Sequence, residues 1–193
     1  MVAGKQQHMS SSRGPYLPTL TIAIALALFV APSHAQVDLR FRQPDVRYVP
    51  TPQQVVDAML DLARVTPADV VFDLGSGDGR IPITAARKYG ARGVGIEIDP
   101  NRIRDANDNL VKAGIGDRVR FINQDLFEAD ISAATVVTLF LLPQVNQRLI
   151  PKLKRELRAG TRVVSYLWDM GDQWPADRST DVDGLMIYLW TIR

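Results

Sequence analysis

The feature that most constrains the fold is an alternation of short apolar segments with amphipathic ones after residue 50. Apolar segments of strand length fall at 69–74, 92–98, 118–123, 134–142 and 161–168. Apolar residues at helical spacing predict helices over 51–63, 81–89, 99–114 and 143–158. We expect a capping box at Thr51 and Gln54, and an interruption of the last helix at Pro151. Strands that alternate with helices in this way form a mostly parallel sheet.

Two further segments complete the expected sheet. The segment 134–142 is almost wholly apolar, as a strand buried on both faces should be. The pair Asp183-Gly184 separates the segments 178–182 and 185–192, which predicts a hairpin with a type I′ turn. The expected fold is therefore α/β, with seven strands and an antiparallel hairpin at the C-terminal end.

The first 35 residues differ in kind from the rest. Lys5 and Arg13 precede the apolar run Leu20–Ala31, and Ala35 ends a pattern that resembles a signal-peptidase site. A run of 12 residues suits a signal peptide better than a membrane span, which needs about 20. We expect a signal peptide or N-terminal membrane anchor at 1–35, an extended linker at 36–50 and a single domain at 51–193. The protein would then be periplasmic or anchored in the inner membrane, and cytoplasmic only if translation starts elsewhere.

Composition excludes several chemistries. The chain has no cysteine, and its two histidines, His8 and His34, lie in the predicted leader. A folded part without Cys or His has no thiolate nucleophile, no Ser-His-Asp triad and no zinc site built from these residues. Of the 23 basic residues two lie in the leader, so 21 remain against 21 acidic ones. A neutral body gives no reason to expect nucleic-acid binding.

A glycine-rich turn follows the first predicted strand. The sequence "DLGSGDGRI" places Gly75, Gly77 and Gly79 between a strand and a helix, where glycines allow a ligand to approach the backbone. A dinucleotide fingerprint would need a third glycine at position 80, which is Arg80. Asp73 at this strand end would repel a pyrophosphate and attract an ammonium group, so we expect a ligand that carries an amine.

Two more carboxylates occupy the corresponding positions of the next two strands. Glu97 lies 22 residues after Gly75, where an acid can accept hydrogen bonds from ribose hydroxyls. Asp125 follows the third predicted strand. Since the carboxyl ends of parallel strands share one edge of the sheet, we expect Asp73, Glu97 and Asp125 to face one crevice.

With these residues in place, the sequence resembles the class I S-adenosylmethionine-dependent methyltransferases. The matching motifs are "DLGSGDG" (73–79), "GIEID" (95–99) and "NQDLF" (123–127). The resemblance implies a Rossmann-like methyltransferase sheet with S-adenosyl-L-methionine as methyl donor. It also implies a set of cofactor-binding residues: Asp73, Gly75, Ser76, Gly77, Gly79, Glu97, Asp125 and Leu126.

A narrower resemblance points to the small protein-lysine methyltransferases that include the ATP-synthase c-subunit lysine methyltransferase. It is carried by "YVPTP" (48–52), "LLPQVNQRLIPKLKREL" (141–157) and "WDMGDQWPAD" (168–177). The implied activity is methyl transfer to a protein or small-molecule acceptor, with protein lysine as the leading substrate. This chemistry requires no metal, and the neutral body gives no reason to expect a nucleic-acid partner. Membrane association would come only from the N-terminal segment.

The acceptor groups are less defined. Candidates to line the acceptor pocket are Tyr48, Pro143, Gln144, Trp168 and Asp169. Tyr48 and Trp168 could form an aromatic wall for a methylammonium, or they could pack the N-terminal segment against the sheet. Two other functions stay open at this point: a non-catalytic cofactor-binding domain of the cell envelope, and a nucleotide-dependent oxidoreductase.

Overall fold

The computed structural model describes residues 1, 2, 4 and 47–193. The predicted leader and the predicted linker up to residue 46 therefore lie almost entirely outside the described residues. Residues 47–50 are exposed and have no regular secondary structure. Within the described part of the chain, no helix combines the length and the apolar character that crossing a membrane requires.

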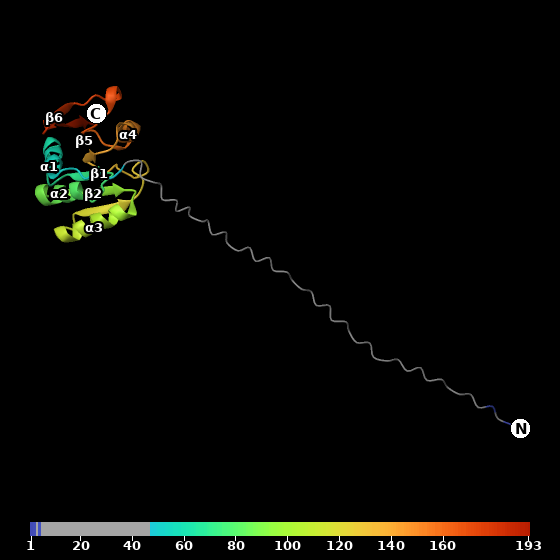
Figure 1. Cartoon of the computed structure of the whole chain (residues 1–193). Helices are drawn as coiled ribbons and strands as arrows, with labels where there is room; N and C mark the ends of the chain where they lie inside the picture. Colours follow the sequence, from blue (N-terminus) through green and yellow to red (C-terminus); the bar gives the residue numbers. More distant parts are fainter. Residues whose placement is uncertain (3, 5–46) are drawn as a thin grey trace. The chain divides into compact units, whose positions relative to one another are not determined.

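Seven strands form one sheet, and four helices connect and cover them (Figure 1). The strands are β1 (Val70–Leu74), β2 (Arg92–Glu97), β3 (Val119–Asn123), β4 (Val136–Leu139), β5 (Arg162–Tyr166), β6 (Arg178–Val182) and β7 (Leu185–Thr191). The helices are α1 (Gln53–Leu62), α2 (Arg80–Tyr89), α3 (Pro100–Ala113) and α4 (Pro143–Glu156), with a short 3₁₀ helix, η1, at Gly171–Gln173.

The strand order is β3-β2-β1-β4-β5-β7-β6. Strands β1 to β5 are parallel, whereas β7 pairs antiparallel with both β5 and β6. The order reverses direction between β1 and β4. In open sheets of this type the ligand crevice lies outside the carboxyl ends of the strands at such a reversal.

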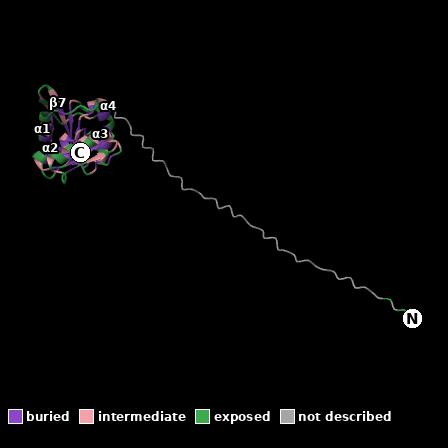
Figure 2. Ribbon diagram, turned by 60° about the horizontal axis from the view of Figure 1, so that its bottom comes forward, coloured by how far each residue is buried: buried purple, intermediate pink, exposed green. Residues whose placement is uncertain are grey.

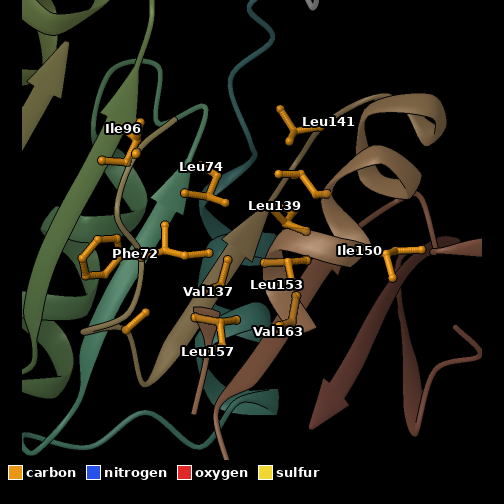
Figure 3. Packing of buried hydrophobic residues seen from close by; sticks show 14 of the residues in the cluster. Phe72, Leu74, Ile96, Val137, Leu139, Leu141, Ile150, Leu153, Leu157 and Val163 are labelled. Atoms are coloured by element: carbon orange, nitrogen blue, oxygen red, sulfur yellow. The ribbon is translucent and has the colours of Figure 1, made fainter. Parts of the chain in front are cut away.

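Alternating strand residues build two hydrophobic layers. Val137 and Val163 belong to the cluster that includes Leu149 and Leu153 of α4 (Figure 3), whereas their neighbours Val136 and Val164 pack with α1 and α2. Both faces of the central strands are thus buried, and Figure 2 shows the buried residues concentrated inside the folded part. This explains why the segment around β4 has no polar face.

The predicted α/β fold is confirmed, including the closing hairpin. Asp183 and Gly184 have φ angles of 53° and 81°, so both turn residues are in the left-handed region that a type I′ turn requires. The helix from residue 99 is also confirmed: Asp99 caps α3 by accepting a hydrogen bond from the Asn101 N–H at 2.8 Å.

Two predicted boundaries are wrong. The strand expected at 134–142 is only Val136–Leu139, because the following residues lead directly into α4, which has Pro143 in its first turn. Helix α4 continues through Pro151 without interruption. Proline removes one helical hydrogen bond, but Leu149, Ile150 and Leu153 bury the same helix face in the core on both sides of it.

The predicted capping box is also wrong. Helix α1 begins at Gln53 with Pro52 at its N-cap and no side-chain cap. Gln54 instead donates a hydrogen bond to Asp183 Oδ2 at 2.7 Å, and the Thr51 carbonyl accepts one from Arg80. Contacts between elements distant in sequence have replaced the local capping pattern.

Candidate active site

A cavity of about 380 Å³ opens at the carboxyl edge of the sheet, beside the reversal between β1 and β4. Its size is within the range of small-molecule sites. It is lined by Arg47, Tyr48, Val49, Pro50, Thr51, Asp73, Gly75, Ser76, Gly77, Asp78, Arg80, Ile81, Ile96, Glu97, Ile98, Asp99, Arg102, Gln124, Asp125, Leu126, Phe127, Phe140, Leu141 and Val145. The three carboxylates expected to share a crevice, Asp73, Glu97 and Asp125, therefore all line one cavity.

Asp73 lies within β1 and is buried, with 3% of its surface exposed. Its Oδ1 accepts a hydrogen bond from Thr138 Oγ of β4 at 2.7 Å, while Oδ2 has no hydrogen-bond partner among the described residues. The pKa of this carboxyl is raised to about 7: burial is the largest cause, the Thr138 hydrogen bond acts against it, and nearby Glu97 and Asp78 add to the rise. A positively charged group in the cavity would restore the ionised form.

Glu97, the last residue of β2, is held by two backbone donors. Its Oε2 accepts from the Gly77 N–H at 2.9 Å and its Oε1 from the Asp99 N–H, also at 2.9 Å. The carboxylate thus ties the glycine-rich turn to the start of α3. A carboxylate fixed in this way still has lone pairs for the two hydroxyls of a ribose.

The glycine-rich turn brings the backbone against the cavity at Gly75 and Gly77, which have φ angles of 85° and 51°. A Cβ on Gly77 would lie 2.4 Å from Tyr48 Cε2, so only glycine allows the tyrosine ring to cover the turn. Ser76 also lines the cavity, and its buried Oγ has no partner among the described residues. A Cβ on Gly95 would lie 2.5 Å from this oxygen, so the hydroxyl is packed against β2.

Arg80 fastens the segment before α1 to this turn. Its guanidinium donates to both oxygens of Asp78, at 2.9 and 2.6 Å, and to the Thr51 carbonyl at 2.8 Å. Burial alone would raise the pKa of Asp78, but the hydrogen bonds and the positive charge of Arg80 together outweigh it and lower the pKa below its ordinary value. Arg80, which stands where a dinucleotide fingerprint would have its third glycine, therefore fixes one wall of the cavity.

Not every predicted residue reaches the cavity. Leu126 lines it beside Asp125, whose Oδ1 accepts from the Phe127 N–H at 2.9 Å. Gly79 does not line it: this residue is the N-cap of α2, and a Cβ there would lie 2.3 Å from the Phe121 ring. Gly79 thus allows close packing against β3.

The acceptor candidates fall into two groups. Tyr48 lines the cavity, and the Arg102 guanidinium lies 4.9 Å from the centre of its ring. Pro143, Gln144, Trp168 and Asp169 are outside the lining, at the carboxyl ends of β4 and β5. Among the described residues, Tyr48 and Trp168 make no ring contact with each other.

Sequence reasoning missed several groups at this site. Thr138 is the one polar residue of β4, and its position within an apolar run was a usable signal. The Arg80 clamp on Thr51 joins residues 29 apart and had no signal in the sequence. In the described ranges, no three Asp, Glu, His or Cys side chains are grouped so that they could hold a metal ion.

Comparison with solved structures bears on the ligand. The folded part is similar to a structure described as an RNA methyltransferase from Salinibacter ruber in complex with S-adenosyl-L-homocysteine. The two are 60% identical with a TM-score of 0.73, over 75% of this chain and 94% of the other. Fold, glycine-rich turn and acidic cavity together define an S-adenosylmethionine-dependent methyltransferase of the Rossmann-like class.

The particular family follows from the sequence comparisons. Residues 73–178 match the family model described as the ANTKMT methyltransferase domain, and the chain belongs to this family. A protein-lysine N-methyltransferase of Saccharolobus islandicus is 48% identical over 153 residues, which are 77% of this chain and 95% of that protein. The adenine nucleotide translocase lysine N-methyltransferase of Mus musculus is 37% identical over 147 residues, which are 76% of this chain and 62% of that protein. The chain is thus an enzyme, and the non-catalytic alternative is not supported.

Proposed function

We propose that this enzyme transfers methyl groups to lysine side chains of a protein. The relationship to a protein-lysine N-methyltransferase along 95% of that protein's length carries the proposal. The cavity supports it through its charge: five carboxylates and three arginines line it. A net negative lining favours cationic ligands, which S-adenosylmethionine and lysine both are.

For the cofactor, we assign a role to each of the three carboxylates. Asp73, with one free oxygen, receives the ammonium group of the methionine part. Glu97, fixed by two backbone N–H groups, accepts the ribose hydroxyls. Asp125 and the neighbouring Leu126 face the adenine. Gly75, Ser76 and Gly77 let the backbone approach the methionine part, whereas Gly79 acts only through packing.

The reaction needs little chemistry from the protein. S-adenosylmethionine, when bound, supplies a methyl group already activated by its positive sulfur. The chain's own contribution is to align the amine and to allow it to lose its proton, because only a neutral amine attacks. The segment from Phe140 to Gln147 carries no charged residue, and Leu142 in it is exposed. A segment without a carboxylate does not stabilise an ammonium and thus favours the reactive form of lysine.

The proposal is tested by following labelled methyl groups into defined acceptors. Purified enzyme would be incubated with methyl-tritiated S-adenosylmethionine and a lysine-containing peptide of the ATP-synthase c subunit, next to the same peptide with Lys→Arg. We expect label in the lysine peptide only, and mono-, di- or trimethyllysine in its mass spectrum. Label in neither peptide and in no protein of the host's cell extract would overturn the proposal.

RNA is the second candidate acceptor, because the structure from Salinibacter ruber carries an RNA methyltransferase name. The same assay with total host RNA separates the two. Label in RNA that resists protease and is lost with ribonuclease would replace lysine by RNA. The cavity's net negative lining argues against a polyanion next to the transferred methyl group.

For the N-terminal segment, we propose export or membrane anchoring through residues 1–35. The support is the basic residues, apolar run and small residues read from the sequence. Determining the mature N-terminus in fractionated cells tests it: an intact N-terminus in the cytosolic fraction would reject it.

A further inference from the structure

A second polar cluster lies outside the cavity, where β5 ends. Asn146 of α4 and Ser165 of β5 are both 0% exposed, and both bind the carbonyl of Trp168. Asn146 Nδ2 donates to Ser165 Oγ and to the Trp168 carbonyl, each at 3.1 Å. Ser165 Oγ in turn donates to the same carbonyl at 2.6 Å. One backbone oxygen therefore receives two buried side-chain hydrogen bonds.

The orientation of the asparagine amide follows from this arrangement. A carbonyl oxygen only accepts, so the amide atom next to the Trp168 carbonyl must be the nitrogen. Both hydrogens of Nδ2 are then used, while the buried Oδ1 has no partner among the described residues. A buried oxygen without a hydrogen bond lowers the stability of the fold, and here that loss accompanies the hydrogen bond to the Trp168 carbonyl.

The backbone held in this way is strained. Leu167 has a φ of 69°, and the Trp168 N–H donates to the Tyr166 carbonyl at 2.9 Å. This is the γ-turn with a positive central φ, which is rare and unfavourable for a residue with a Cβ. The Leu167 N–H still donates to the Met186 carbonyl at 2.7 Å, so the turn begins directly after the last bond to β7. Strain of this kind persists where surrounding contacts impose it, and it clusters at functional sites.

The turn sets the direction of the backbone at Trp168, whose side chain is exposed. Trp168 has 39% of its surface exposed, whereas Met170, two residues on, is fully buried in the core. β5 is the neighbour of β4, and the residues that follow β4, Phe140 and Leu141, line the cavity. Phe140 also contacts Tyr166, the first residue of the turn, with a distance of 4.6 Å between ring centres. The Trp168 backbone is thus fixed just after β5, the strand next to β4, whose following residues line the cavity.

We infer that Asn146 and Ser165 are positioning residues that fix the Trp168 indole as a contact for the methyl acceptor. This inference rests on the proposed lysine transfer for the identity of the acceptor. An indole at this place offers an apolar face to the aliphatic stem of a lysine and tolerates its methylated products. Its position depends on the backbone turn, and the turn depends on the two buried side chains.

The positioning is tested first without an acceptor, by ¹⁹F NMR of protein labelled with 5-fluorotryptophan. The chain has three tryptophans, Trp168, Trp174 and Trp190. In Ser165→Ala and Asn146→Ala we expect the Trp168 resonance to shift and broaden, while the other two keep their positions. Thr161→Val is the matched control, because Thr161 is buried at the opposite end of β5 and donates to the Ala134 carbonyl. It should leave all three resonances unchanged at a similar loss of thermal stability.

Steady-state kinetics then test the contact with the acceptor. In Ser165→Ala we expect kcat/KM for the c-subunit lysine peptide to fall roughly tenfold or more, through KM, since small misplacements of a positioning group are costly. Affinity for S-adenosylhomocysteine should stay at the wild-type value, and Ser165→Thr, which keeps the hydroxyl, should recover most of the loss. Trp168→Ala should match Ser165→Ala.

Three outcomes would overturn the inference. The first is an unchanged Trp168 resonance in both variants. The second is a wild-type KM in Ser165→Ala and Trp168→Ala, and the third is an equal KM change in Thr161→Val. If wild-type enzyme labels RNA instead of the peptide, the lysine proposal fails, and the same KM comparison on RNA decides the role of Trp168.

Discussion

The carboxylate of Glu97 accepts a hydrogen bond from the backbone N–H of Gly77 at 2.9 Å. This contact joins the end of β2 to the turn after β1, two segments 20 residues apart. It means that the expected ribose-binding acid also holds the shape of the glycine-rich turn. Loss of Glu97 should therefore affect both the ribose and the methionine part of the cofactor.

We expect Glu97→Ala to weaken S-adenosylhomocysteine binding by about 100-fold or more, because two charge-assisted hydrogen bonds to the ligand and the support of the turn are lost together. Calorimetry measures the affinity, and circular dichroism checks the fold. Glu128→Ala removes an exposed acid outside the cavity and should bind normally. Wild-type affinity in Glu97→Ala would remove this residue from the site.

Cofactor binding should depend on pH through Asp73. Burial first, and then the neighbouring acids, raise the pKa of Asp73 to about 7 in the free protein. A bound ammonium favours the ionised form, so affinity for S-adenosylhomocysteine should fall about tenfold for each pH unit below 7. Calorimetry between pH 5.5 and about 8.5 follows this, and Asp73→Asn should show weak binding without that dependence. A flat wild-type profile would contradict the assigned role.

Asp73 should also make the stability of the free protein depend on pH. The direction is opposite to that of cofactor binding: affinity rises with pH, whereas the contribution of Asp73 to stability falls. The ordinary pKa of 3.8 applies to the unfolded chain, and the folded value is higher. The contribution of Asp73 to stability is therefore fully present below pH 3.8 and is lost as pH rises through 7. Asp73→Asn stays neutral and should not lose it, so the stability difference between the two proteins should grow in the variant's favour from pH 4 to about 7 in urea unfolding. A constant difference would contradict the raised pKa.

Gly77→Ala should destabilise the turn in two ways. The new Cβ would lie 2.4 Å from Tyr48 Cε2, and the φ of 51° is unfavourable for alanine. We expect a loss of about 1–3 kcal/mol in the free energy of unfolding, together with weaker cofactor binding. When Gly77→Ala is made in a Tyr48→Ala background, the clash is gone and only the cost of the positive φ should remain. If the losses of stability caused by Gly77→Ala and Tyr48→Ala are simply additive, the tyrosine does not cover the turn.

The strain at Leu167 predicts a reversal of the usual order of glycine and alanine. Leu167→Gly should be more stable than Leu167→Ala by about 1 kcal/mol, because glycine adopts a φ of 69° without a steric cost. At Val111, an exposed position in α3, alanine should instead be better than glycine by about 1 kcal/mol. Urea unfolding of the four variants measures both differences. The same order at both positions would show that the turn at Leu167 is not strained.

Local sequence patterns determined most of the secondary structure and the main residues of the cofactor site. Periodicity and turn residues predicted the alternation of strands and helices, and Asp183-Gly184 predicted the closing hairpin, because φ preferences and burial act on neighbouring residues. The glycine-rich turn and the spacing of Asp73, Glu97 and Asp125 predicted a shared crevice, because parallel strands end at one edge. The resemblance to small lysine methyltransferases is likewise confirmed.

Only the tertiary structure decided how these groups are held. Packing of Leu149 and Leu153 carries α4 through Pro151, and Arg80 donates to the Thr51 carbonyl, which would accept the first helical hydrogen bond if Thr51 were the N-cap. The raised pKa of Asp73 and the strained turn at Leu167 depend on β4, α4 and β7, which are distant along the chain. Energies of burial and of side-chain hydrogen bonds arise between such elements, and no local sequence pattern encodes which groups will meet.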